Sequence, residues 1–298
     1  DPSGFMLVPF YGREREFSFD YSISGTSEGD ILVGRGGQQT FYGNSGNDIM
    51  SGGDGNDHLY GGPDDDELSG EAGDDFLDGG TGNNTLTGGP GFDTASFAAL
   101  PYAAYVNIRN ADQSGFEVYR HNGTAIELTD LVLSTERFIG SSYADVAEYG
   151  RSNSGITVSP LTGDTAGLRV QKTGGEVSSR NIEFVAFEGV DGSVYKDVMQ
   201  GNTADNVFYG RVGNDTFLPS AGSDIFYGGG NTDTADYSAP SFDYHITTLD
   251  AVAGNYRIQK IFQNGTQGYD LLFSVENLIG KPVSVFEAAG GQVIRGTA

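Results

Sequence analysis

A repeat of nine residues constrains the fold of this chain more than any other feature. From Gly25 to Ser96 the sequence divides without a gap into eight nonads: GTSEGDILV, GRGGQQTFY, GNSGNDIMS, GGDGNDHLY, GGPDDDELS, GEAGDDFLD, GGTGNNTLT and GGPGFDTAS. Every nonad begins with Gly, carries Asp, Asn or Gln at position 6, and has an apolar residue at position 8. A flexible glycine-rich linker has no reason to keep this register, so the pattern predicts a repeat architecture.

A second, shorter array runs from Gly192 to Asp236. It reads GSVYKDVMQ, GNTADNVFY, GRVGNDTFL, PSAGSDIFY and GGGNTDTAD. A lone nonad, GSSYADVAE, occupies residues 140–148 with Asp145 at position 6. Both arrays end on a similar phrase, GFDTASF at 91–97 and NTDTADY at 231–237, which we interpret as closure of the repeat with Ala at the inward position.

Each nonad divides into a six-residue turn and a three-residue strand. Glycines at positions 1, 2 and 4 permit positive φ angles, so the backbone can curl and direct carbonyl groups inward. The apolar residue at position 8 is the inward residue of the short strand. Two nonads then complete one coil of 18 residues, and coils stack at the usual strand spacing of about 4.8 Å. The pattern predicts an all-β fold built on a parallel β-roll.

This geometry brings acidic side chains at position 6 directly above one another. Two carboxylates about 5 Å apart repel by roughly 3 kcal/mol at an effective dielectric constant of 20. Residues 25–96 carry 14 acidic side chains and one basic one, Arg35. A calcium ion between adjacent turns would reverse this repulsion, because calcium suits six to eight hard oxygen ligands at 2.3–2.6 Å. We therefore predict that the roll binds several Ca²⁺ ions.

The predicted metal ligands are the Asp residues at position 6 and the glycines of the nonad that carries every position of the motif. They are Asp30, Asp48, Asp57, Asp66, Asp75, Asp93, Asp197, Asp215, Asp224 and Asp233, with Gly52, Gly53 and Gly55. We expect the best sites at the pairs Asp30/Asp48, Asp48/Asp66, Asp57/Asp75, Asp75/Asp93, Asp197/Asp215 and Asp215/Asp233. Sites that use the uncharged Gln39, Asn84 or Asn206 should be weak or empty.

The nonads resemble the calcium-binding repeats of the RTX (repeats in toxin) family, also called hemolysin-type repeats. The nonad GGDGNDHLY at residues 52–60 matches every position of that motif, and the repeats cover about 117 residues. The resemblance implies a right-handed parallel β-roll, export of the unfolded chain through a type I secretion system, and folding outside the cell on meeting calcium. It also implies an uncleaved export signal at the C-terminus.

We predict five segments along the chain. They are an N-terminal β cap at 1–24, a first β-roll at 25–96, a β insert region at 97–191 that includes the lone nonad, a second β-roll at 192–236, and a C-terminal β cap at 237–298. Residues 97–139 and 237–279 look like related inserts because they end on similar phrases, STERFIG and SVENLIG. Their alternating apolar and polar residues predict antiparallel strands that cap the rolls. No segment has the pattern of a helix.

Composition excludes several classes of function. The net charge of −25 argues against nucleic acid and anionic membrane surfaces as partners. The chain has no cysteine, and it has no apolar run of the ~20 residues that would insert into a membrane. Its three histidines form no HExxH motif, and no nucleophile elbow or phosphate loop is present. We assign no catalytic residue.

Two hypotheses for the function remain open at this point. The first is a secreted calcium-binding protein that serves as a scaffold, adhesin or surface-associated module. The alternative is an extracellular polysaccharide-active enzyme, or its calcium-binding part, because Glu136 and Glu276 recur in the two inserts and Glu183 stands in a variant of the same phrase. We favour a structural role for these glutamates, such as accepting hydrogen bonds from turn amides.

Four aromatic residues of the first insert could stack on sugars but suit strand packing better: Tyr102, Tyr105, Phe116 and Tyr119. Extracellular polysaccharide and the cell surface are the candidate partners besides calcium.

Overall fold

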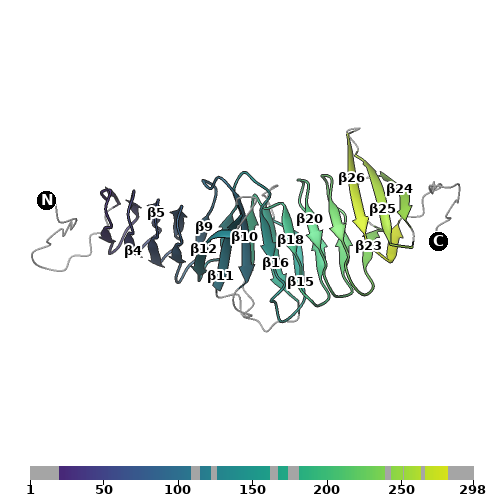
Figure 1. Cartoon of the computed structure of the whole chain (residues 1–298), viewed down its shortest axis with the longest axis horizontal. Coiled ribbons are helices and arrows are strands. Elements are labelled where there is room, and N and C mark those ends of the chain that lie inside the picture. Colours follow the sequence, from purple (N-terminus) through teal and green to yellow (C-terminus); the bar gives the residue numbers. More distant parts are fainter. Residues whose placement is uncertain are drawn as a thin grey trace, which may run out of the picture. The chain divides into compact units, whose positions relative to one another are not determined.

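The structure, a computed structural model, describes residues 20–108, 115–121, 126–161, 167–173, 181–238, 243–250, 252–262 and 266–280. All the regular structure in these ranges is β-strand, as the sequence predicts (Figure 1). No helix in the described part of the chain could cross a membrane. Most of the predicted N-terminal cap and the last 18 residues lie outside these ranges. The chain forms two compact units, one of residues up to 145 with 184–186, the other of residues 146–183 and from 187 onward.

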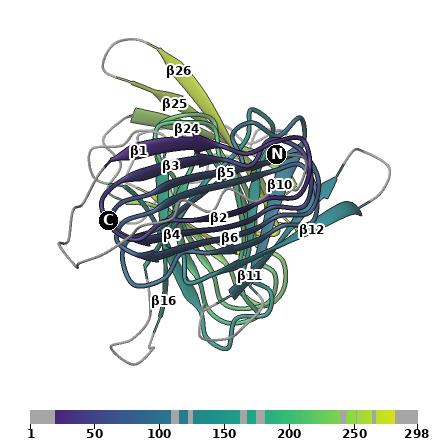
Figure 2. The ribbon, with the colours of Figure 1, turned by 90° about the vertical axis from the view of Figure 1, so that its left-hand side faces the viewer.

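The first unit is a parallel β-roll in which successive strands alternate between two sheets. Its strands up to the end of the first array are β1 (Tyr21–Ser24), β2 (Ile31–Val33), β3 (Gln39–Tyr42), β4 (Ile49–Asp54), β5 (His58–Gly62), β6 (Glu67–Ala72), β7 (Phe76–Gly80), β8 (Thr85–Thr87) and β9 (Thr94–Ser96). Odd-numbered strands form one layer and even-numbered strands the other (Figure 2). The predicted all-β parallel β-roll is thereby confirmed.

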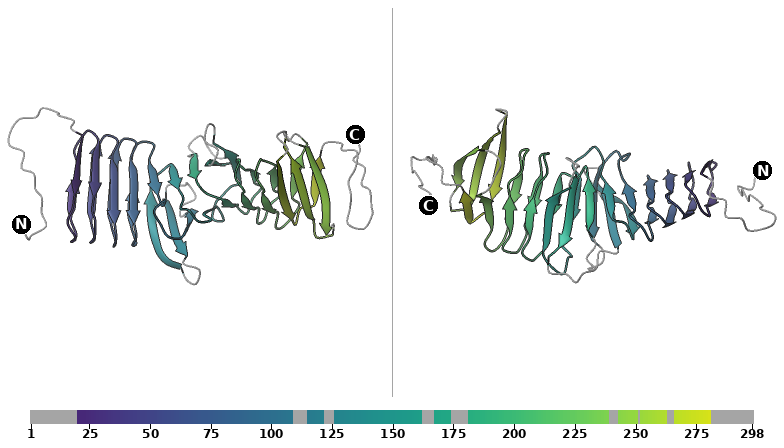
Figure 3. Two further views of the ribbon diagram at one scale, coloured as in Figure 1. Left: turned by 90° about the horizontal axis from the view of Figure 1, so that it is seen from above. Right: turned by 180° about the vertical axis from the view of Figure 1, so that it is seen from behind.

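The strand register confirms that one coil contains 18 residues. In one sheet Leu32 pairs with Met50, Met50 with Leu68, and Leu68 with Leu86. These side chains at position 8 are buried, as are their counterparts in the other sheet, and together they form the core between the layers. The short strands are parallel and regularly stacked in the segment coloured purple to blue in Figure 3. Apolar periodicity of nine residues thus sets both the register and the core.

Antiparallel strands follow the first array, as predicted. They are β10 (Ala103–Ile108), β11 (Gly115–His121) and β12 (Ile126–Leu133), followed by β13 (Arg137–Ile139). Strand β12 pairs in parallel with β8, and β11 and β10 extend that sheet in antiparallel fashion. Strand β13 pairs in parallel with β9 of the other sheet.

The second unit repeats this plan. Its strands are β14 (Val146–Glu148), β15 (Ile156–Pro160), β16 (Gly167–Lys172), β17 (Ile182–Val185, of which Phe184 and Val185 belong to the first unit), β18 (Gly189–Asp191), β19 (Val198–Gln200), β20 (Val207–Tyr209), β21 (Thr216–Leu218), β22 (Ile225–Tyr227), β23 (Thr234–Tyr237), β24 (Asp243–Asp250), β25 (Asn255–Ile261), β26 (Gln267–Phe273) and β27 (Asn277–Gly280). The parallel series β18–β20–β22 and β19–β21–β23 form the roll. Strand β26 pairs with β22, and β25 and β24 extend the sheet as β11 and β10 do in the first unit.

Candidate metal centre

The side chains at position 6 form a hydrogen-bonded ladder inside the turns. One carboxylate oxygen of an Asp in this ladder accepts a hydrogen bond from the backbone N–H of the position-6 residue one coil earlier. In the first unit the bonds run from Asp30 N to Asp48 Oδ1 (2.7 Å), Gln39 N to Asp57 Oδ1 (2.7 Å), Asp48 N to Asp66 Oδ1 (2.8 Å), Asp57 N to Asp75 Oδ1 (2.8 Å) and Asp75 N to Asp93 Oδ1 (2.9 Å). In the second unit they run from Asp197 N to Asp215 Oδ1 and from Asp215 N to Asp233 Oδ1 (both 2.8 Å). The structure therefore stacks the predicted ligands one coil apart.

The second carboxylate oxygen accepts no hydrogen bond in seven of these residues. We call this set the open carboxylates: Asp48, Asp57, Asp66, Asp75, Asp93, Asp215 and Asp233. In each of them Oδ2 is buried, and no donor among the described residues reaches it. A buried carboxylate oxygen without a donor is unfavourable unless a cation completes its environment. This ladder is the strongest indication of a metal site in the described chain.

Main-chain carbonyl oxygens lie close to the Oδ2 atoms of the open carboxylates, as the surroundings of the glycines at position 1 show. A Cβ atom built on Gly43 would lie 2.1 Å from Asp48 Oδ2 and 2.6 Å from the carbonyl oxygen of Gly61 in the next coil. At Gly210 both distances, to Asp215 Oδ2 and to the next coil's carbonyl oxygen, are 2.5 Å. The missing side chain thus leaves a carboxylate oxygen and a carbonyl oxygen facing each other. This explains why position 1 requires Gly throughout the first array.

The electrostatics of the open carboxylates also call for a cation. Burial raises the pKa of Asp66, Asp93 and Asp215 to about 7, and that of Asp75 and Asp233 to about 6. The amide that donates to each carboxylate lowers its pKa, but neighbouring acidic groups raise it again. Desolvation and like charges therefore both disfavour the ionised form in the protein alone. A divalent cation would reverse this balance.

A second class of turn supplies its carboxylate with hydrogen-bond donors from its own position 2. We call these the closed carboxylates: Asp30, Asp145, Asp197 and Asp224. Asp30 Oδ2 accepts hydrogen bonds from the Thr26 backbone N–H (2.6 Å) and hydroxyl (2.9 Å). Ser141, Ser193 and Ser220 at position 2 donate to the other three in similar ways. The backbone N–H of position 2 donates to Oδ2 in three of these turns, and the Ser220 hydroxyl donates to it in the fourth, so each has a donor that the open turns lack.

Backbone conformation at position 2 separates the two classes. The position-2 residues that precede the seven open carboxylates have left-handed φ angles. They are Asn44 (78°), Gly53 (102°), Gly62 (120°), Glu71 (76°), Gly89 (122°), Arg211 (72°) and Gly229 (101°). The Ser and Thr residues of the closed turns are not in this region. Sequence reasoning missed the distinction, although the signal is a Ser or Thr at position 2.

Acidic residues of the two inserts extend the ladder. Asn84 N donates to Asp130 Oδ1 (2.8 Å), and Asp224 N donates to Asp270 Oδ1 (2.9 Å). The two pairs have the same separation, 46 residues. Sequence reasoning missed Asp130 and Asp270, and their signal is the shared spacing of six residues to the recurrent Glu.

The recurrent glutamates have the structural role that the sequence suggested. Glu136 Oε2 accepts a hydrogen bond from Asp93 N (3.0 Å), and Glu276 Oε2 accepts one from Asp233 N (2.7 Å). Each glutamate therefore occupies the place that a position-6 Asp of one further coil would take. The prediction that they bind turn amides is confirmed.

The remaining candidates lie apart from the ladder. Glu183 forms an ion pair with Arg169 (2.8 Å). His58 is exposed and stacks on Phe76, which agrees with surface display. Of the aromatic set, Phe116 is fully buried against Phe138 and belongs to the strand core, and Tyr102, Tyr105 and Tyr119 are partly buried.

The donor set fits calcium better than a metal held by side chains alone. No group of three or more His, Cys, Asp or Glu side chains in the described ranges could hold a metal ion. A site in the roll must therefore combine carboxylate oxygens with main-chain carbonyls, a hard-oxygen set that calcium accepts readily. Magnesium demands a tighter octahedral shell and keeps its water, so it suits this arrangement less.

Comparison with known protein families agrees with this geometry. A search of curated proteins finds no match. The solved structure of the extracellular lipase LipA from Serratia marcescens is similar to this chain at 17% sequence identity and a TM-score of 0.25. The similarity covers 80% of this chain and 38% of the lipase, so the chain spans well under half of the lipase's length. A family model for the RTX calcium-binding nonapeptide repeat matches four times, at residues 24–59, 60–95, 191–226 and 200–235. These matches fall on the two arrays of the roll, so the chain carries RTX calcium-binding nonapeptide repeats.

Proposed function

We propose that this chain is a secreted calcium-binding module that folds on binding extracellular Ca²⁺ and serves as a scaffold, adhesin or surface-associated module. The observation that carries the proposal is the set of seven buried carboxylates, each with an oxygen that accepts no hydrogen bond from the described residues. Their number and regular stacking favour several ions along the roll.

The calcium sites lie between consecutive turns on each edge of the roll. Four of the predicted pairs have two open carboxylates: Asp48/Asp66, Asp57/Asp75, Asp75/Asp93 and Asp215/Asp233. We assign the strongest sites to these pairs, with glycine carbonyls of the turns, such as those of Gly52, Gly53 and Gly55, as further ligands. The other two predicted pairs each include a closed carboxylate, so we expect weaker binding there.

Folding is coupled to calcium by the charge of the repeats. Without metal, the stacked carboxylates repel one another and the apolar core is thin, so the unfolded chain is favoured. With metal, binding free energy becomes folding free energy. Extracellular calcium modules bind with dissociation constants of about 10⁻⁴–10⁻³ M. The chain would then stay unfolded at cytosolic calcium levels and fold after export, which suits type I secretion.

A calcium count on matched variants tests the proposal. In Asp57→Asn the ladder bond from Gln39 N is retained while one open carboxylate loses its charge. We expect fewer bound ions and a higher calcium concentration at the folding midpoint, measured by equilibrium dialysis and circular dichroism. Asp145→Asn is the control because Ser141 already satisfies Asp145, so its calcium count should equal that of the wild type. Equal counts in all three proteins, or none in the wild type, would refute the assignment.

A further inference from the structure

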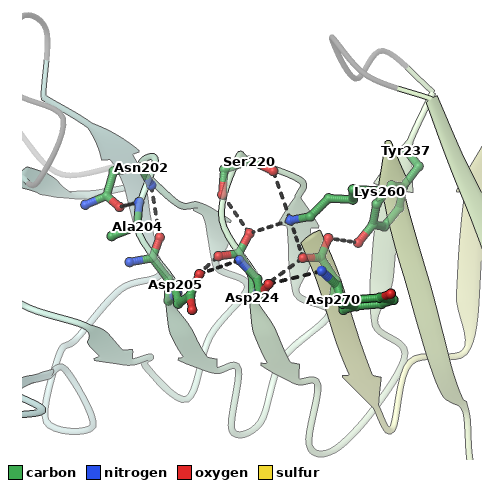
Figure 4. Close-up of polar contacts among 11 residues, drawn as sticks. Asn202, Ala204, Asp205, Ser220, Asp224, Tyr237, Lys260 and Asp270 are labelled. Atoms are coloured by element: carbon green, nitrogen blue, oxygen red, sulfur yellow. Dashed lines mark hydrogen bonds and ion pairs between the residues drawn. The ribbon is translucent and has the colours of Figure 1, made fainter. Parts of the chain in front are cut away.

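A buried lysine lies at the last carboxylate pair on one edge of the roll in the second unit. We call such a pair of ladder carboxylates from consecutive coils, with the turns that carry them, a rung. Lys260 of β25 is fully buried, with 0% of its side chain exposed. Its ammonium group contacts Asp224 Oδ2 at 3.2 Å, forms a closer ion pair with Asp270 Oδ1, and donates a hydrogen bond to the carbonyl oxygen of Ser220 at 3.0 Å (Figure 4). Among the Lys and Arg residues whose burial the structure describes, no other is buried. Burial of this one lysine therefore needs an explanation in its surroundings.

The carboxylate pair beside Lys260 shares its ladder hydrogen bond and strand register with the pairs assigned to calcium, although the turn at Asp224 is of the closed class. Asp224 N donates to Asp270 Oδ1 at 2.9 Å, as Asp48 N donates to Asp66 Oδ1 at 2.8 Å. The residues after Asp224 pair in parallel with those after Asp270, in the register found between successive coils. Asp224 and Asp270 are therefore a carboxylate pair one coil apart, although 46 residues separate them in sequence.

The ammonium group contacts the kinds of oxygen that a calcium ion would use here. Its partners are two carboxylate oxygens from consecutive coils and one main-chain carbonyl from a turn. The two oxygens that Lys260 does not contact are also satisfied: Asn206 N donates to Asp224 Oδ1 at 3.1 Å, and Tyr237 Oη donates to Asp270 Oδ2. Asp224 Oδ2 accepts a second hydrogen bond from Ser220 Oγ at 2.8 Å. With one positive charge against two negative ones, this pair has a net charge of −1, whereas a pair of open carboxylates has −2.

We propose that the Lys260 ammonium takes the place of a calcium ion between Asp224 and Asp270. The inference rests on the proposed function, because it assumes that the equivalent rungs bind calcium. It makes the C-terminal rung of the roll independent of metal, and each coil of a stacked repeat is stabilised mainly by its neighbours. The rung would then be a permanent surface on which the calcium-dependent coils of the second array assemble.

The first unit has a basic residue in the same strand register. In β25, Lys260 lies two residues after Ile258, the partner of Asp270. In β11, Arg120 lies two residues after Val118, the partner of Asp130. The strand register thus places a basic residue at the same position in both inserts.

Two substitutions at Lys260 in the full-length protein test the proposal. Lys260→Ala removes the ammonium and leaves space for an ion, so we expect it to bind one more calcium ion than the wild type. Its melting temperature should fall at low calcium and recover at high calcium. Lys260→Met removes the charge but fills the space, so we expect lower stability without an extra ion or recovery. Lys172→Ala is the control, because Lys172 contacts Asn153 on the surface and should keep the wild-type count.

The outcomes separate this inference from the proposed function. The wild-type calcium count tests the proposed function, and the difference between Lys260→Ala and the wild type tests the role of Lys260. An unchanged count in Lys260→Ala, whether its stability is kept or is lost equally at all calcium concentrations, would show an ordinary ion pair and overturn the inference.

Hydrogen exchange on the wild-type protein tests the inference without a variant, so the result does not depend on whether the Lys260 variants fold. At a calcium concentration just above the folding midpoint, where calcium leaves its sites most often, the amide of Leu271, which donates to Asp224 O (2.8 Å), should exchange more slowly than the amide of Glu67, which donates to Asp48 O (2.8 Å). Equal exchange rates at the two amides would overturn the proposal.

Discussion

Two glycine-to-alanine substitutions in the first array differ only in what the new methyl group meets. In Gly61→Ala the Cβ would lie 2.3 Å from Asp66 Oδ2 and 2.8 Å from the carbonyl oxygen of Gly79, closer than such atoms can approach. In Gly36→Ala the nearest atom, Asp54 O, is 3.8 Å away. Neither glycine has a left-handed φ angle, so backbone strain does not separate them.

The expected difference follows from crowding and from the calcium ion. Forcing atoms into a packed site costs about 1–3 kcal/mol, and loss of a ligand bound at 100 times its dissociation constant removes about 2.7 kcal/mol more. Gly36→Ala should be neutral or gain up to about 1 kcal/mol. At about 2–4 °C per kcal/mol, a loss of about 4–6 kcal/mol lowers the melting temperature of Gly61→Ala by about 8–24 °C.

Thermal melting followed by circular dichroism at several calcium concentrations measures both contributions. The melting temperature of Gly61→Ala should rise less steeply with calcium than that of the wild type, while Gly36→Ala should follow the wild type. If the two variants melt at the same temperature and respond alike to calcium, the carboxylate beside Gly61 is not a metal ligand and the reasoning is wrong.

Three further predictions concern the ladder end, the core and pH. Glu276→Ala leaves the buried amide of Asp233 without its acceptor, so it should lower the free energy of unfolding by about 1–3 kcal/mol in saturating calcium; an unchanged denaturant midpoint would contradict this. Leu68→Ala removes a fully buried core side chain and should cost about 2–5 kcal/mol, and a loss below that range in a denaturant titration would mean that the core is loosely packed. Because the pKa values of Asp66 and Asp93 are raised from 3.8 to about 7 in the fold, the stability they contribute without calcium is present at pH 4 and is lost as the pH rises through 7. Scattering in chelator should therefore show a more compact chain at pH 5 than at pH 8, and the reverse order would count against the buried ladder.

Much of the fold could be predicted because each nonad specifies its own turn, its short strand and its inward-facing residue. The apolar residue at position 8 defines the inward face, and its recurrence fixes the 18-residue coil that pairs Met50 with Leu68. The end phrases of the arrays indicated where antiparallel strands begin. The stacking of Asp residues then followed from coil length alone.

The difference between open and closed carboxylates could not be predicted from the motif. Position 2 accepts Gly, Asn44, Glu71 and Arg211 in the same left-handed conformation, so its residue type appears unconstrained. Only the structure shows that Thr26 leaves this conformation and turns its N–H and hydroxyl toward the carboxylate. A Ser or Thr at position 2 marks the closed turns, but the nonad motif does not specify this position and so does not indicate the change of backbone conformation.

Lys260 was missed for another reason. It belongs to an insert strand without repeat periodicity, 36 residues from Asp224, and reaches the ladder only through the antiparallel register of β25 and β26. Pairing across strands is a long-range property, and nothing in the residues near Lys260 indicates its partner. Sequence patterns therefore located the ladder but not all of the groups that neutralise it.

Titration of calcium into chelator-treated protein tests the central claim most directly. Far-UV circular dichroism and small-angle scattering would be followed together, with magnesium as the control. A compact chain of this length has a radius of gyration of roughly 20 Å, against roughly 60 Å when unfolded. We predict a cooperative gain of β signal and a fall in the radius of gyration with calcium, and neither change with magnesium. A chain that keeps the same signal and radius with and without calcium would contradict the account.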